Sequence, residues 1–113
     1  MLAQLNRLKK KKDFEKVFKL GKGIKLGFIA LKINKNNFKN SRFGFVVSLK
    51  VSKKAVVRNK VKRRLREIVR ARIKDIKKGI DVVLIALPDS STKDFEETEK
   101  LVEKLFKKAG ILI

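Results

Sequence analysis

The side chains that could do chemistry in this sequence are cations, and they concentrate in one segment. Residues 56–67, VVRNKVKRRLRE, contain six Lys or Arg residues and a single acid. Arginine suits phosphate because its planar guanidinium group can donate two parallel hydrogen bonds. A solvated helix face usually balances its cations with acids four residues away, and Glu67 and Asp75 are too few to do so here. The segment therefore favours a phosphate-binding surface over an ordinary solvated face.

The chain lacks the residue types on which most catalytic chemistry depends. It has no His and no Cys, which removes the commonest general base, the thiol nucleophile and the usual ligands of transition metals. Most of its acids lie near the C-terminus, so no carboxylate cluster is expected beside the basic segment to hold a metal ion. Asp81 and Asp89 flank an apolar run, which is typical of turns and caps. We therefore predict no catalytic residue and no metal site in the protein.

Charge is unevenly distributed along the 113 residues. The 32 Lys and Arg against 11 Asp and Glu give a formal net charge of +21, so a polyanion is the first partner to consider. Residues 1–52 carry 14 basic and 2 acidic residues, residues 53–78 carry 13 and 2, and from residue 80 the balance reverses to 5 and 7. No apolar run reaches the roughly 20 residues of a membrane span or resembles a secretory signal. We expect a cytoplasmic protein with a single domain over residues 1–113 and no membrane partner.

The basic segment has the spacing of an amphipathic helix. At about 100° per residue, its apolar side chains share one arc: Val57, Val61, Leu65, Ile68, Val69, Ile73 and Ile76. Polar and basic side chains gather on an adjacent arc: Asn59, Lys62, Arg63, Arg66, Arg70 and Lys74. Such a helix can dock its apolar arc on a sheet while its row of cations points outward.

A shorter helix is expected near the N-terminus. Phe14, Val17 and Phe18 have helical spacing between Asp13, a candidate N-cap, and Gly21, a candidate left-handed C-terminal stop. Core packing is the default role for the two rings. The chain has eight Phe residues, however, which leaves room for an exposed ring that stacks on an unpaired base.

Three apolar segments predict strands, and a last helix follows them. The strand segments are 23–33, with a break near Gly27, 42–49, and 80–87, whose continuous apolar run is typical of a central strand. Residues 34–41 are expected to form a loop because of their Asn content. Ser91 or Thr92 can cap the final helix, and Gly110 can end it. The order of elements predicts an α+β sandwich with helices packed on one sheet.

The segment SKKAVVRNKVKRRLREIVR (52–70) resembles the RNR signature of the bacterial ribonuclease P protein component family. Arg58-Asn59-Lys60 and the cations after it carry the likeness. Further segments resemble that family in the same order: NRLKKKKDFEKVFKLGK (6–22), RFGFVVSLKVSKK (42–54), DVVLIAL and FEETEKLVEKLFKKAG. In one departure, Lys54 runs directly into Ala55, where family members usually carry a short Gly-containing insertion. The entrance to the signature helix is therefore shortened.

The resemblance implies a fold, partners and binding residues. The fold would be α-β-β-β-α-β-α with a left-handed β-α-β crossover. The protein would bind the catalytic RNA of ribonuclease P, which cleaves precursor tRNA at its 5′ end and itself requires Mg²⁺. The residues implied to bind RNA are Asn6, Arg7, Lys53, Lys54, Arg58, Asn59, Lys62, Arg63, Arg66 and Arg70. Those implied to line a cleft for the 5′ leader of precursor tRNA are Phe14, Phe18, Phe28 and Leu31, where Leu31 replaces a frequent aromatic residue.

Two other functions remain open at this point. A structural RNA-binding protein of the ribosomal type would share the basic surface without promoting tRNA processing. A DNA-binding module would insert the row of cations in a major groove. DNA is disfavoured because strands, and not the first helix of a helix-turn-helix, precede the basic helix.

Overall fold

The computed structural model describes residues 3–113 of the chain. Its elements follow the order α1 (Lys11–Leu20), β1 (Lys22–Leu26), β2 (Ile29–Lys35), β3 (Arg42–Val47), α2 (Ala55–Arg72), β4 (Ile80–Ala86) and α3 (Phe95–Ala109). Short 3₁₀ turns occupy Gln4–Asn6, Ile73–Asp75 and Pro88–Thr92. The predicted α+β class and the order α-β-β-β-α-β-α are confirmed.

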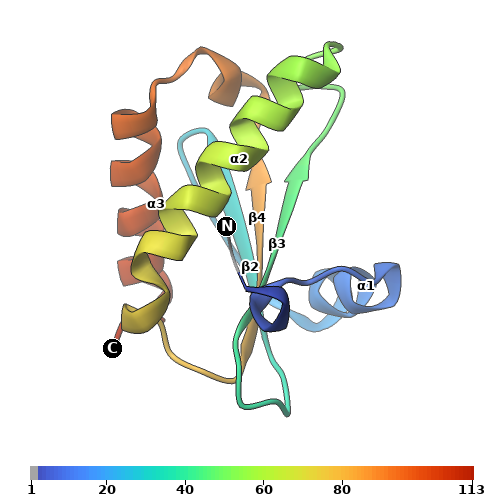
Figure 1. Cartoon of the computed structure of the whole chain (residues 1–113), viewed down its shortest axis with the longest axis vertical. Coiled ribbons are helices and arrows are strands. Elements are labelled where there is room, and N and C mark those ends of the chain that lie inside the picture. Colours follow the sequence, from blue (N-terminus) through green and yellow to red (C-terminus); the bar gives the residue numbers. More distant parts are fainter. Residues whose placement is uncertain (1–2) are drawn as a thin grey trace.

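The four strands form one mixed sheet in the order β1-β2-β4-β3. β2 pairs antiparallel with β1 and β4, whereas β3 pairs parallel with β4 and lies at an edge. β4 is central, as its continuous apolar run predicted. Figure 1 shows α2 in front of the sheet, with β3 to the right of β4 and both arrows pointing upward. The connection from β3 through α2 to β4 is therefore left-handed, against the general preference for right-handed crossovers.

The strand register assigns the two faces of the sheet to different helices. Leu31 lies in one cross-strand row with Ile24 and Leu84, and this face packs against α2 and α3 in the main core. The next residue, Lys32, lies on the opposite face, because successive side chains of a strand alternate. On that face Val17 of α1 packs with Leu8 and Val83 in a smaller buried cluster. The figure accordingly shows α1 apart from the other two helices.

The ends of α1 differ from those predicted. The helix begins at Lys11 with Lys10 as its N-cap, whose side chain makes no capping hydrogen bond, and Asp13 lies in the first turn. Asp13 instead pairs with Arg42 on β3. Gly21 has an extended backbone rather than a left-handed one. A Cβ at Gly21 would collide with the carbonyl oxygens of Val17 and Ile33, so glycine is required there for close approach.

The N-cap of α3 also differs from the predicted Ser91 or Thr92. Ser91 and Thr92 lie in the preceding 3₁₀ turn, and Asp94 is the N-cap: its Oδ1 accepts a hydrogen bond from the Glu97 N–H at 2.8 Å. The left-handed stop at Gly110 is confirmed, with φ of 70°. Pro88 explains the shift, because it begins a short turn that delays the helix.

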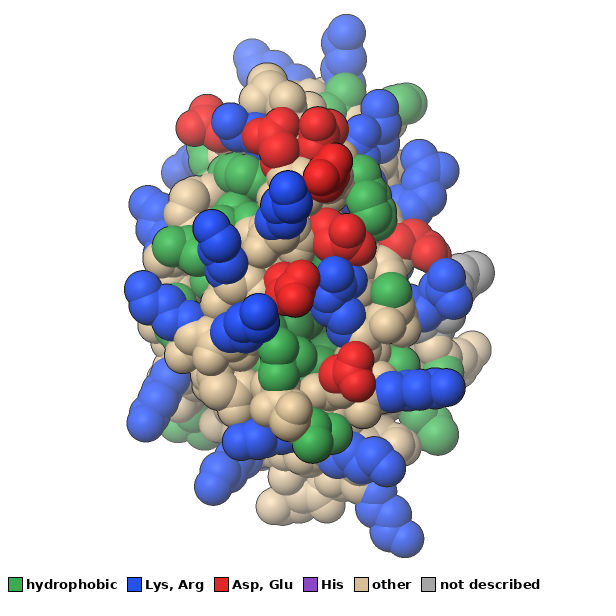
Figure 2. Space-filling view, turned by 90° about the vertical axis from the view of Figure 1, so that its left-hand side faces the viewer, with side chains coloured by type: hydrophobic (Ala, Val, Ile, Leu, Met, Phe, Trp, Pro, Cys, Tyr) green, Lys and Arg blue, Asp and Glu red, His purple; other side chains and the backbone are tan. Residues whose placement is uncertain are grey.

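Acidic side chains gather on the α3 side of the molecule, where Lys and Arg side chains lie among them (Figure 2). On this helix Glu96 pairs with Lys100. Arg72 at the end of α2 pairs with Glu99 and Glu103, which ties the two helices together.

Within residues 3–113, no helix combines the length and the apolar content needed to cross a bilayer.

Candidate nucleic-acid interface

Helix α2 separates its apolar and cationic side chains as its spacing predicted. Val61, Leu65, Ile68 and Val69 are buried against the sheet and α3. Asn59, Arg63, Arg66 and Arg70 are exposed, and Lys62 is half-buried beside them. The cationic row of α2, defined as Asn59, Lys62, Arg63, Arg66 and Arg70, therefore lies on the surface.

Most of the cationic row is available to a ligand. In the described part of the chain, no carboxylate lies within ion-pair distance of Lys62, Arg63 or Arg66. Arg70 donates to Glu67 at 3.0 Å, and this hydrogen bond lowers the pKa of the Glu67 carboxyl. Three uncompensated cations within five residues of a rigid helix form a surface suited to phosphates.

The entrance to α2 is held by Arg58. Its Nη1 donates to the carbonyl oxygens of Ser52 and Lys53, both at 2.9 Å. Its guanidinium group therefore stabilises the turn before the helix, a role that the sequence alone did not reveal. Lys53 and Lys54 are exposed at this end, and α2 begins directly after them at Ala55.

The N-terminal segment runs beside the edge strand β3. Leu8 N–H donates to the Phe43 carbonyl at 2.8 Å, and Arg7 forms an isolated parallel bridge with Phe43. Asn6 is half-buried and its Nδ2 donates to the Ser41 carbonyl at 2.8 Å. Asn6 therefore anchors the segment, while Arg7 extends toward α2.

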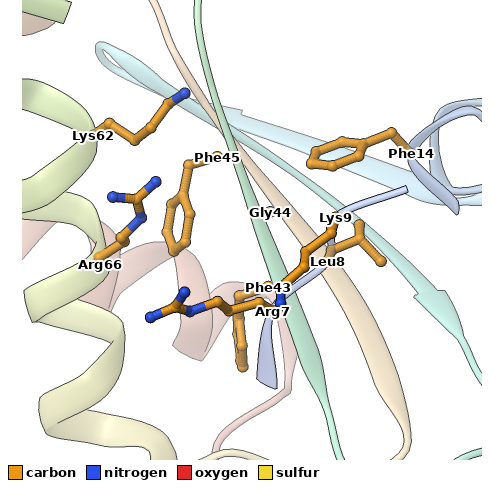
Figure 3. Close-up of a pocket in the computed structure, with 9 residues that line it drawn as sticks. All are labelled: Arg7, Leu8, Lys9, Phe14, Phe43, Gly44, Phe45, Lys62 and Arg66. Atoms are coloured by element: carbon orange, nitrogen blue, oxygen red, sulfur yellow. The ribbon is translucent and has the colours of Figure 1, made fainter. Parts of the chain in front are cut away.

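A groove of about 240 Å³ lies between this segment and α2 (Figure 3). It is lined by Arg7, Leu8, Lys9, Phe14, Phe43, Gly44, Phe45, Lys62 and Arg66. Figure 3 shows Lys62 and Arg66 extending from α2 beside Phe45, and Arg7 extending toward α2 from the opposite wall. The groove thus combines cations on both walls with aromatic side chains, as a single-stranded nucleic acid requires.

Two of the four residues predicted for a leader cleft lie together on α1. Phe14 is half-buried over the sheet, and Phe18 is 39% exposed. Lys32 of β2 joins them: its Nζ lies 5.9 Å from the Phe18 ring centroid and donates to the Phe18 carbonyl at 3.2 Å. This α1 face offers two rings and one cation beside an apolar strand surface.

The other two predicted cleft residues lie on the opposite face of the sheet. Leu31 has no exposed surface and belongs to the main core, so its assignment to the cleft is wrong. Phe28 packs against the same core and lies under Lys93, whose Nζ is 5.6 Å from its ring centroid. The prediction placed Leu31 on the wrong face of β2. Side chains alternate along a strand, and it is the neighbouring Lys32 that points toward α1.

An ion-pair network fixes α1 relative to the sheet. Arg42 Nη2 lies 2.7 Å from Asp81 Oδ2, and Arg42 Nε donates to Asp81 Oδ1 at 2.9 Å. Arg42 Nη1 also lies 3.3 Å from Asp13 Oδ2 on α1. The hydrogen bond to Asp81 raises the pKa of the Arg42 guanidinium group. Sequence reasoning missed this network, because Asp13 and Asp81 looked like local caps.

The described residues contain no group of three or more His, Cys, Asp or Glu side chains that could hold a metal ion. The cations and aromatic rings of α2, the groove and the α1 face form an arrangement suited to phosphates and bases.

Comparison with known proteins identifies relatives over nearly the whole chain. A family model described as Ribonuclease P matches residues 2–110. A ribonuclease P protein component from Clostridium botulinum is 42% identical over 107 residues, which cover 94% of this chain and 96% of the relative. One from Synechocystis is 39% identical over 112 residues, which cover 98% and 90%.

Solved structures agree with these relatives. The RNase P protein of Staphylococcus aureus is similar with a TM-score of 0.89 at 27% identity, covering 96% of this chain and 98% of that one. The RNase P protein of Thermotoga maritima has a TM-score of 0.82 at 36% identity, with 90% and 96% covered. The fold, the cationic helix and the extent of these matches lead to one conclusion: the chain belongs to the ribonuclease P protein component family.

Proposed function

We propose that this chain is the non-catalytic subunit of ribonuclease P, which binds the catalytic RNA and the 5′ leader of precursor tRNA in the bacterial cytoplasm. The RNA cleaves the leader, using Mg²⁺ that it binds itself. The observation that carries the proposal is the unpaired set Lys62, Arg63 and Arg66 on α2, in a chain of this family.

The first contribution of the protein is electrostatic. A catalytic RNA and its tRNA substrate repel each other, and a partner of formal charge +21 reduces that repulsion. Each phosphate neutralised by a Lys or Arg releases condensed counterions, which favours assembly at low salt. The holoenzyme should therefore need less Mg²⁺ than the RNA alone.

The cationic row of α2 contacts the catalytic RNA. Its side chains project from a helix whose apolar face is locked in the core, so little backbone freedom is lost on binding. Arg63 and Arg66 can each donate paired hydrogen bonds to phosphate oxygens. Arg58 keeps the entrance turn in place and supports the row indirectly.

The α1 face holds the leader. Phe14 and Phe18 offer rings for unpaired bases, and Lys32 offers a cation for the neighbouring phosphate. Precursor tRNA makes these contacts and mature tRNA does not, since only the precursor carries a leader. The protein therefore favours binding of substrate over product.

The proposal is tested by adding the protein to a bacterial ribonuclease P RNA at low Mg²⁺ with precursor tRNA. The 5′ cleavage rate should rise, and the double variant Arg63→Ala, Arg66→Ala should reduce that gain. Binding without any acceleration would overturn the proposal and favour a structural RNA-binding role.

A further inference from the structure

Two large apolar side chains lie open to solvent around one pocket, away from α2. Phe38, in the loop of residues 36–41, is 59% exposed, and Leu5, in the N-terminal 3₁₀ turn, is 71% exposed. They line a pocket of about 260 Å³ together with Gln4, Arg7, Asn40 and Arg42. Exposed apolar side chains that cluster around a hollow mark a binding site more often than isolated ones do.

The Arg42 guanidinium group lies over the Phe38 ring and holds it in place. The guanidinium carbon of Arg42 lies 4.6 Å from the ring centroid, within cation–π range. Arg42 is itself fixed by its two hydrogen bonds to Asp81, whose side chain is only 6% exposed. A flexible cation on the surface would leave the ring mobile, whereas this one anchors it to the sheet.

The loop that carries Phe38 is also braced. Phe38 N–H donates to Asn36 Oδ1 at 2.8 Å, and Asn36 Nδ2 donates to Asp81 Oδ1 at 2.8 Å. The same amide lies 3.3 Å from the Asn40 carbonyl oxygen. One aromatic ring is thus presented to solvent in a fixed orientation, which lowers the entropic cost of stacking a ligand on it.

The lining of this pocket matches the chemistry of an unpaired nucleotide. Phe38 and Leu5 offer apolar surface to the faces of a base. Gln4 and Asn40 carry amides, which both donate and accept hydrogen bonds as base edges require. The lining residues include no acid, which suits the attached phosphate, although the charge of Arg42 is already paired with Asp81 and Asp13.

The pocket continues the cationic surface already described. Asn40 also lines a neighbouring hollow with Lys74 and Lys78, beyond the C-terminal end of α2. Arg7 lines both this pocket and the groove that contains Lys62 and Arg66. An RNA strand along α2 would therefore reach Phe38 through hollows that share Arg7 and Asn40.

We infer that the Phe38–Leu5 pocket binds one unpaired base of the RNA partner, as a stacking site separate from α2 and from the α1 face. The inference rests on the proposed function, in that the partner is RNA. The base comes either from the catalytic RNA or from the precursor tRNA.

The variant Phe38→Trp tests this directly, because the chain has no Trp and no Tyr and its fluorescence would come from that one ring. Stacking of a base should quench the emission. Quenching with the catalytic RNA alone would assign the base to that RNA, and quenching only after precursor tRNA joins the assembled holoenzyme would assign it to the substrate. The matched control is Phe95→Trp, at an exposed Phe at the start of α3, which should not be quenched.

Phe38→Ala should weaken binding of the RNA identified in this way by about five- to a hundredfold, the usual range for one stacked base. Phe95→Ala should leave that affinity unchanged. Absence of quenching in both arms while Phe38→Trp binds RNA normally would overturn the inference, as would equal quenching at residue 95. Because the readout is fluorescence and not cleavage, this failure is distinct from a failure of the proposed function.

Discussion

The ring of Phe14 lies directly on Gly44: a Cβ at Gly44 would come within 2.5 Å of two of its ring carbons. Glycine at this position lets α1 approach the sheet and lets the ring form the floor of the groove. A side chain of any size at residue 44 must push the ring away.

Gly44→Ala should therefore displace Phe14 and disturb the α1 face. We expect a loss of about 1–3 kcal/mol in the free energy of unfolding, the usual cost of overpacking, and weaker binding of precursor tRNA. Gly23→Ala is the matched control: residue 23 lies in the same cross-strand row, and its Cβ would make only ordinary contacts at 3.5 Å or more. Equal effects of the two substitutions, measured by denaturant unfolding and filter binding, would contradict this explanation.

Phe18→Ala should weaken the binding of precursor tRNA without changing that of mature tRNA. Loss of one stacking ring is expected to weaken precursor binding by about 1–3 kcal/mol while leaving mature tRNA unaffected. Phe28→Ala removes a ring from the other face of the sheet, so it should lower stability without this discrimination. Titrations of both tRNAs against the holoenzyme measure the difference. If Phe18→Ala weakens both equally, the ring does not contact the leader.

The double variant Arg63→Ala, Arg66→Ala should bind the catalytic RNA less tightly and with less salt dependence. Each lost phosphate contact is expected to reduce the magnitude of the slope of log affinity against log salt by about 0.7–0.9, so the two substitutions together should reduce it by about 1.4–1.8. The double variant Lys104→Ala, Lys108→Ala removes the same charge from α3 and should leave the slope nearly intact. A similar change in both variants would mean that net charge, and not the α2 surface, governs binding.

Arg42→Met should destabilise the fold by about 3–5 kcal/mol, because it leaves the Asp81 carboxylate buried without its cation. Adding Asp81→Asn should recover part of this loss. Hydrogen bonding to Asp81 raises the pKa of Arg42, so the stabilisation is present below the unfolded-state pKa of arginine and lost only as pH rises through the higher folded-state value. The loss in Arg42→Met should thus stay constant from neutral to moderately alkaline pH in thermal unfolding followed by circular dichroism. A double variant no more stable than Arg42→Met would show that the buried charge is not the cause.

Periodicity was enough to predict the order of elements and the cationic row, because both depend on local spacing. Helical spacing places Val61, Leu65, Ile68 and Val69 on one arc of α2, and that arc is the buried one. The left-handed crossover came from the family resemblance alone, since general rules of chain handedness favour the opposite.

The errors occurred where tertiary contacts decide. Asp13 looks like a cap in sequence, yet Arg42, 29 residues away, takes its carboxylate. Strand alternation shows that Leu31 and Lys32 face opposite sides, but it does not show which side α1 covers. The roles of Arg58 and Asn6 as anchors of the backbone depend on carbonyl groups whose positions only the fold defines.

The concentration of acids over α3 has a consequence for the approach to RNA. With cations along α2 and carboxylates gathered over α3, the molecule carries an electric dipole as well as a net charge. In the field of a polyanion this dipole experiences a torque, which we expect to turn α2 toward the polyanion before the surfaces touch and to raise the fraction of productive collisions. The torque fades as the Debye length shrinks, so added salt slows association as well as weakening the complex.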